Sequence, residues 1–100
     1  LLPIVMEYNA PAALDKYVDI AKALDVYTPG MTKEEAADAA CTEIENLSRR
    51  VGIPAHLSDL GITEADIDAL ADQAIADVCT PGNPREVTRD DIVALYKSIL

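Results

Sequence analysis

A helix-start signal occurs three times along this chain and restricts the fold more than any other feature. Each signal is a threonine followed three positions later by an acidic residue. In this arrangement the hydroxyl caps the helix and the carboxylate reaches back to the cap. An apolar stripe with helical spacing follows every signal, so each should open an amphipathic helix. The pairs are Thr32 with Glu35, Thr63 with Asp66, and Thr88 with Asp91.

The apolar stripes predict the helices that these signals open and one helix before them. The first helix is expected over residues 12–25, ahead of a TPG break at 28–30. The helix after Thr32 should end near Gly52, because glycine suits the left-handed position just past a helix end. The stripes are Leu14, Tyr17, Val18, Ala21 and Leu24; Ala37, Ala40, Cys41, Ile44, Leu47 and Val51; Ile67, Leu70, Ala71, Ala74, Ile75 and Val78; and Ile92, Leu95, Tyr96 and Ile99.

The same patterns predict the fold class. No stretch alternates between apolar and polar residues as a half-buried strand would, and no repeat or low-complexity tract is present. Half of the 100 residues are apolar, which is enough for a hydrophobic core without disulfides. We therefore expect residues 1–100 to form a single all-α segment, a bundle of four to five helices.

The charge balance is strongly acidic and excludes some classes of partner. Asp and Glu number 18 against 8 Lys and Arg, a formal net charge of −10. Nucleic-acid binding depends on clustered Lys and Arg and is not expected. No stretch approaches the roughly 20 apolar residues of a membrane span, and nothing resembles a signal peptide, so a cytoplasmic location is expected. The apolar opening LLPIVM suggests the tail of a longer polypeptide.

Carboxylates are plentiful, but they form no metal-binding pattern. Asp66 and Asp68 resemble the start of a calcium loop, yet no glycine follows at the required place. His56 is the only histidine and has no partner at metal-ligand spacing, so a role as a turn residue is expected. Ser58 precedes Asp59, the reverse of the order at the attachment serine of acyl carriers. No catalytic or metal-binding residue is predicted within the chain.

Residues 79–86 read CTPGNPRE and follow the third expected helix. Pro81 and Pro84 each lack an amide donor and restrict the residue before them, so the helix should not continue past Cys79. Asn83 ahead of Pro84 is a turn signal. The segment is therefore predicted to be a rigid turn between two helices.

Cys79 in this turn admits four interpretations: a nucleophile, a metal ligand, a redox partner for Cys41, or a small residue at a pocket wall. No CxxC pair, second histidine or basic setting accompanies it, so thiol chemistry has little support. The simpler interpretation is that both cysteines are reduced and at least partly buried, because free cysteine is among the most buried residue types. For Cys79 two explanations stay open at this point: a rigid helix-to-helix turn that needs no ligand, and a turn that places Cys79 at the rim of a pocket.

Three stretches of the sequence carry a family resemblance. They are YNAP at 8–11, VGIPAHLSDLGITEADIDALADQAIADV at 51–78, and CTPGNPREVTRDDIVALY at 79–96. Together they resemble the C-terminal end of the iron-containing (group III) alcohol dehydrogenases, which have a dehydroquinate synthase-like fold. The resemblance covers essentially the whole chain, and GIPxxLxDLGI combined with CTxGNPR is its specific part.

The resemblance implies a two-domain enzyme, in which an N-terminal α/β domain binds NAD(P) and a C-terminal helical domain holds Fe²⁺. The family binds the iron through one aspartate and three histidines, the last of them in a His-Gly step expected shortly before Leu1. Both sites are therefore expected upstream of this chain. The implied reaction is hydride transfer between nicotinamide and the carbonyl carbon of a small aldehyde, with the iron as Lewis acid. A homodimer is expected for the full-length protein.

The resemblance also implies where this chain would meet the substrate. In the family the cysteine-containing turn approaches the substrate cleft, so Cys79 is the leading candidate for a pocket-lining residue, with Thr80 and Asn83 beside it. Pro81 stands where members of the family often have glycine. The alternative function is a self-contained acidic helical interaction or carrier domain, which would act by binding a partner.

Overall fold

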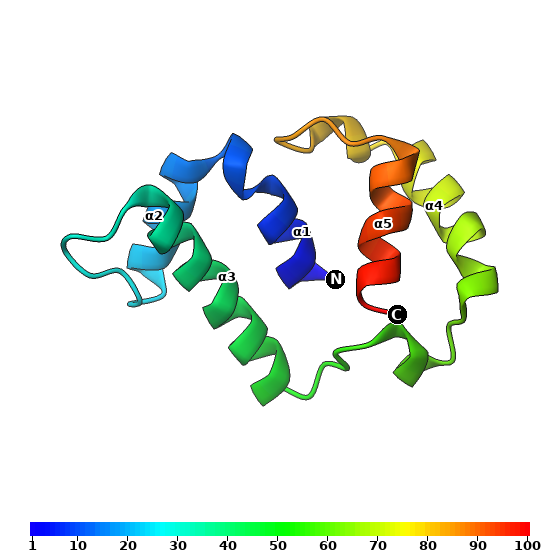
Figure 1. Ribbon diagram of the computed structural model, residues 1–100, viewed down its shortest axis with the longest axis horizontal. Helices are drawn as coiled ribbons and strands as arrows, with labels where there is room; N and C mark the ends of the chain where they lie inside the picture. Colours follow the sequence, from blue (N-terminus) through cyan, green and yellow to red (C-terminus); the bar gives the residue numbers. More distant parts are fainter. The chain divides into compact units, whose positions relative to one another are not determined.

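A computed structural model describes all residues 1–100 and contains five α-helices, short 3-10 helices and no strand. The all-α prediction is confirmed. None of the helices combines the length and the apolar character needed to span a membrane. The helices are α1 (Leu2–Asn9), α2 (Leu14–Ala23), α3 (Lys33–Arg50), α4 (Ile67–Ala76) and α5 (Arg89–Ser98) (Figure 1).

Residue contacts divide the chain into two compact units. The N-terminal unit comprises Leu2–Gly52 and contains α1, α2 and α3. The C-terminal unit comprises Ile53–Leu100 together with Leu1 and contains α4 and α5.

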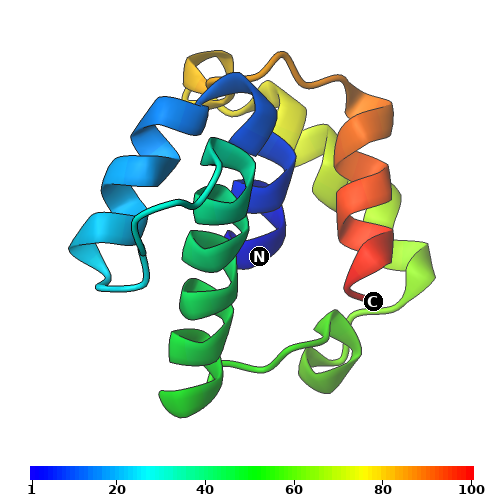
Figure 2. The ribbon, with the colours of Figure 1, turned by 60° about the vertical axis from the view of Figure 1, so that its left-hand side comes forward.

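Helix α3 is the centre of the N-terminal unit, and both α1 and α2 pack against it (Figure 2). Small side chains line the contact between α2 and α3: Ala21, Ala36 and Ala40 are fully buried. Because alanine has only a methyl group, the two helices can approach closely there. Larger side chains close the edges of this contact, namely Val18, Ile20, Val26, Tyr27 and Met31.

A second cluster in the same unit joins α1 to the other two helices. Tyr17 of α2 and Cys41 of α3 are buried, and Met6 of α1 packs against them. The Tyr17 hydroxyl donates to the Met6 carbonyl at 2.7 Å, which ties α2 to α1. Helix α1 was not among the helices expected from the sequence. It has no start signal, and short helices of this kind gain most of their stability from tertiary packing.

The ends of α2 and α3 follow local sequence chemistry. Thr32 and Glu35 form the expected reciprocal capping box at the start of α3. Gly52 lies just past the end of α3 with φ of 83°, as expected. Helix α2 ends at Ala23, before the expected residue 25, because Asp25 adopts a left-handed φ of 60° and the Val26 amide donates back to the Ala21 carbonyl. This is a Schellman ending with aspartate in the usual glycine position.

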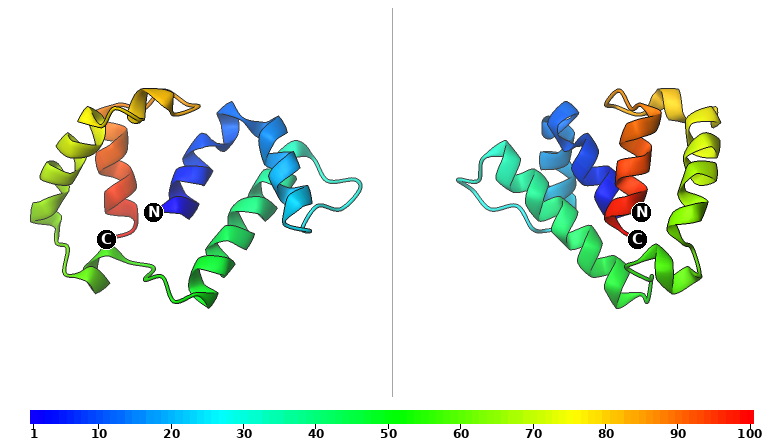
Figure 3. Two further views of the ribbon diagram at one scale, coloured as in Figure 1. Left: turned by 180° about the vertical axis from the view of Figure 1, so that it is seen from behind. Right: turned by 45° about the vertical axis from the view of Figure 1, so that its right-hand side comes forward.

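In the C-terminal unit, α4 and α5 lie side by side (Figure 3). Ile67 and Ala71 of α4 and Ile92 of α5 are buried. Arg89, the first residue of α5, bridges back to α4: its Nε lies 2.7 Å from Asp72 Oδ1 and its Nη2 lies 3.2 Å from Asp68 Oδ1. The predicted start signals hold here as well, although a 3-10 turn at Glu64–Asp66 precedes α4.

Two of the predicted apolar stripes are only partly buried. In α3 the first half of the stripe is buried, but Leu47 and Val51 are 42% and 64% exposed. The apolar face of α4 was expected to extend to Val78. This expectation is wrong, because Val78 is 90% exposed. The physical reason is that the helix ends at Ala76 and the backbone of Asp77 is extended, with ψ of 135°.

Candidate functional site

The segment that follows α4 is a turn held by its own hydrogen bonds. A 3-10 turn covers Thr80–Gly82. The Asp77 Oδ1 accepts from the Cys79 amide at 2.8 Å, and the Thr80 hydroxyl donates to the Ala74 carbonyl at 2.5 Å. Further on, the Asn83 side-chain amide donates to the Arg85 carbonyl at 2.6 Å. The predicted turn between two helices is confirmed, and side-chain hydrogen bonds stabilise it in addition to the two prolines.

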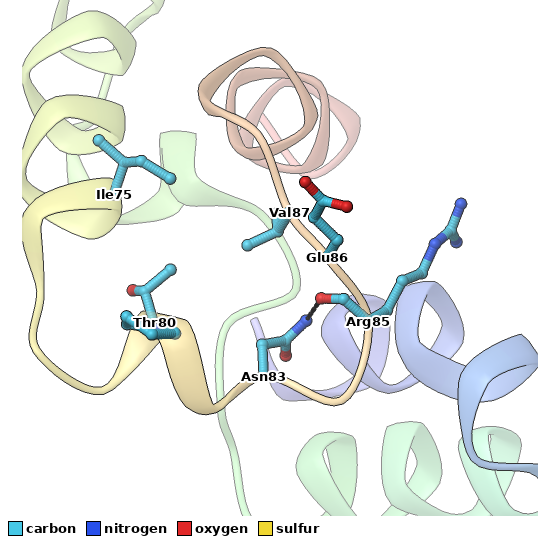
Figure 4. Close-up of a pocket in the computed structure, with 7 residues that line it drawn as sticks. Ile75, Thr80, Asn83, Arg85, Glu86 and Val87 are labelled. Carbon is cyan, nitrogen blue, oxygen red and sulfur yellow. Dashed lines mark hydrogen bonds between the residues drawn. The ribbon is translucent and has the colours of Figure 1, made fainter.

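A pocket of about 410 Å³ opens between this turn and the end of α4. Figure 4 shows Ile75 reaching it from α4, Thr80 and Asn83 from the turn, and Val87 from the segment that leads to α5. Its lining combines apolar side chains with polar and charged ones. The lining residues are Ile75, Thr80, Pro81, Asn83, Arg85, Glu86 and Val87.

The structure brings together two of the three residues predicted to line a substrate pocket. Thr80 and Asn83 share the pocket described above, whereas Cys79, although adjacent in the turn, is not among its lining residues. Val87 and Glu86 also line it, and nothing in the sequence analysis singled them out. Asp77 was missed too, although an aspartate at the end of a helix commonly accepts from an amide two residues on.

The two cysteines have different environments. Cys41 is buried in the N-terminal unit, as expected. Burial, together with the negative charges of Glu7 and Asp38, raises the pKa of the Cys41 thiol to about 11. Cys79 is exposed, so the expectation that both thiols are at least partly buried is wrong for this one. Its exposure follows from the early end of α4, since the residues after Ala76 leave the packed face of the helix.

The side chains present do not fit an iron ion. No group of three or more His, Cys, Asp or Glu residues is arranged to hold a metal ion. The carboxylates of Asp68 and Asp72 are engaged by Arg89, and Asp66 accepts from the Thr63 amide at 2.8 Å. His56 is exposed in the connector before the 3-10 turn at Leu57–Leu60.

These residues also lack the kind of loop that binds the pyrophosphate of a dinucleotide. Such sites use a glycine-rich loop between a strand and a helix N-terminus. The chain has no strand, and its four glycines are dispersed.

The whole chain, residues 1–100, matches the family model described as "Fe-containing alcohol dehydrogenase family, C-terminal". The sequence motifs predict similarity to lactaldehyde reductase and 1,3-propanediol dehydrogenase within that family, and both are among its relatives. Lactaldehyde reductase of Escherichia coli (strain K12) is 54% identical over 96 residues, which is 96% of this chain and 25% of the relative. The 1,3-propanediol dehydrogenase of Klebsiella pneumoniae is 38% identical over 97 residues, 97% of this chain and 25% of the relative.

The fold comparison agrees with the sequence comparison. The crystal structure of a 1,3-propanediol oxidoreductase superposes with a TM-score of 0.94 at 35% identity, over 99% of this chain and 26% of that structure. The chain thus spans about a quarter of the length of the relatives that it matches. These matches do not support the alternative of a self-contained interaction or carrier domain. The chain belongs to the Fe-containing alcohol dehydrogenase family and corresponds to its C-terminal part.

Proposed function

We propose that this chain is the C-terminal helical part of a larger two-domain enzyme, an NAD(P)-dependent and iron-dependent alcohol dehydrogenase or aldehyde reductase. The observation that carries the proposal is the match of all 100 residues to the C-terminal family model. In this proposal the nucleotide-binding domain and the iron ligands belong to segments upstream of residue 1. The side chains described above fit neither group, so they have another task.

The task we assign to this chain is to shape the substrate cleft. The turn after α4 carries Cys79, Thr80 and Asn83, and hydrogen bonds restrain it. A rigid wall of this kind orients a small substrate and limits its size without taking part in the proton or hydride transfer. The substrate is a small alcohol or aldehyde. Lactaldehyde should be tested first, because the relative that is 54% identical to this chain is named lactaldehyde reductase.

The other parts of the proposal concern the full-length protein. It acts as a cytoplasmic homodimer, and its partners are the small substrate and the nucleotide. The net charge of −10 of residues 1–100 supports the exclusion of nucleic acid as a partner of this part, because it would repel a phosphate backbone. We assign no membrane partner.

Enlarging Cys79 in the full-length enzyme tests whether the turn borders the cleft. The Cys79→Phe variant should raise the KM for lactaldehyde by about tenfold or more, or shift the preference toward shorter aldehydes, because a larger ring fills space that the substrate needs. The iron content, measured by metal analysis, should not change. The assay is NADH oxidation across a series of aldehydes of increasing length.

A Gln73→Phe variant is the matched control. Gln73 lies on the exposed side of α4, so the same ring there should leave the aldehyde series unaltered. If Cys79→Phe also leaves every KM and the size preference at the wild-type values, Cys79 does not line the substrate pocket.

A further inference from the structure

The hydroxyl of Thr80 forms a hydrogen bond with the end of α4. Ala74 lies in the last turn of that helix, and its carbonyl accepts from the Asp77 amide at 3.3 Å. The Thr80 hydroxyl donates to the Ala74 carbonyl at 2.5 Å, in a partly buried position. Figure 4 shows the hydroxyl oxygen of Thr80 on the side of α4. Because a hydroxyl has a single hydrogen, Thr80 cannot also donate to a bound substrate.

The backbone around Cys79 is held by hydrogen bonds. Its amide donates to Asp77 Oδ1 at 2.8 Å, and the next amide, that of Thr80, donates to the Asp77 carbonyl at 3.1 Å. Its carbonyl accepts from the Gly82 amide at 3.0 Å. Among the hydrogen bonds of the turn named here, only the one from the Thr80 hydroxyl joins a side chain of the turn to a residue within α4. Without it, the turn would be attached to the helix through Asp77 and the backbone alone.

We propose that Thr80 is a positioning residue: it fixes the turn that carries Cys79 against α4, and it influences substrate selection through that turn without contacting the substrate by its hydroxyl. The inference rests on the proposed function. Thr80 lines the pocket, as the sequence led us to expect, but the inference assigns its hydroxyl a different task. A lining residue would act through its own contact with the substrate. A positioning residue acts through the conformation of the turn.

Two substitutions in the full-length enzyme separate these roles. Thr80→Val keeps the shape of the side chain and removes the hydroxyl, whereas Thr80→Ser keeps the hydroxyl and removes the methyl group. We expect Thr80→Val to change the ratio of kcat/KM for butanal to that for acetaldehyde by about fivefold, the equivalent of one typical hydrogen bond. Thr80→Ser should return this ratio toward the wild-type value. Thr42→Val, at an exposed threonine of α3, is the matched control and should not alter the ratio.

Hydrogen exchange gives a readout that needs no activity. The amides of the turn that donate within it belong to Cys79, Thr80, Gly82 and Asn83. In Thr80→Val these amides should exchange about tenfold faster in the peptide that contains them, and in Thr80→Ser they should exchange at nearly the wild-type rate. The tenfold figure corresponds to about 1.4 kcal/mol of lost local stability, the upper range for one hydrogen bond.

The outcomes separate this inference from the proposed function. Faster exchange in Thr80→Val with an unchanged aldehyde ratio would make Thr80 merely structural and overturn the proposal. Unchanged exchange would overturn it as well. A greater change of the ratio in Thr80→Ser than in Thr80→Val would favour a direct contact through the methyl group and reject the positioning role. If the wild-type enzyme reduced no aldehyde, the proposed function would fail, and the exchange measurement alone would still decide whether Thr80 holds the turn.

Discussion

At the scale of single residues, burial separates the two cysteines. Cys41 is 4% exposed in the contact between α1, α2 and α3, whereas Cys79 is exposed after the end of α4. The spacing of apolar residues predicted the burial of Cys41, since this residue belongs to the stripe of α3. No such pattern was available for Cys79. Beyond the end of a helix, the burial of a side chain depends on the path of the backbone in the turn. Local sequence patterns do not determine that path.

The two thiols should therefore react at very different rates with iodoacetamide. Only the thiolate is nucleophilic, and a pKa of about 11 means that less of Cys41 is ionised at any given pH than of a thiol with the ordinary value of 9.0. At pH 8 we expect Cys79 to be alkylated first and Cys41 to remain protected until the pH approaches 11 or the chain unfolds. Mass spectrometry of the two cysteine peptides measures both rates. Equal labelling of the two at pH 8 would show that Cys41 is not buried as described.

At the scale of elements, the starts of the helices were predictable and some of the ends were not. The capping threonines and the stop at Gly52 are local chemistry, readable within three or four residues. Helix α1 was missed because packing against α3, which is distant in sequence, stabilises it. The end of α4 was placed too late because the apolar spacing continues to Val78 while the backbone already turns at Asp77.

The capping box of α3 offers a test at this scale. Thr32→Ala removes the hydroxyl that accepts from the Glu35 amide at 3.1 Å and leaves the helix start uncapped. We expect the free energy of unfolding to fall by about 1 kcal/mol, the usual cost of a lost N-cap. Thr42→Ala, within the same helix and exposed, is the matched control and should be neutral or slightly stabilising, because alanine has the higher helix propensity. Urea titrations of the two variants and the wild type compare them directly; equal stability of all three would contradict a role for the cap.

At the scale of the whole molecule, the family was predictable and the site only in part. The motifs GIPxxLxDLGI and CTxGNPR carried the family assignment, and the match over residues 1–100 bears it out. The location of the turn followed from its prolines. The lining of the pocket did not, because Ile75 and Val87 are brought to Thr80 by the packing of α4 and α5 and not by nearness in sequence. The iron and nucleotide sites were expected elsewhere, and the side chains of this chain fit neither.

The most direct test of the proposed function is an NAD(H)-coupled assay of the full-length protein, purified without oxygen and loaded with Fe²⁺. The account predicts that NADH or NADPH is oxidised when lactaldehyde or another short aldehyde is added, that the rate falls to the background level when a chelator removes the iron, and that restored iron recovers it. A fully folded, iron-loaded protein that oxidises neither nucleotide with any short aldehyde, and reduces neither NAD nor NADP with the matching alcohols, would contradict the account.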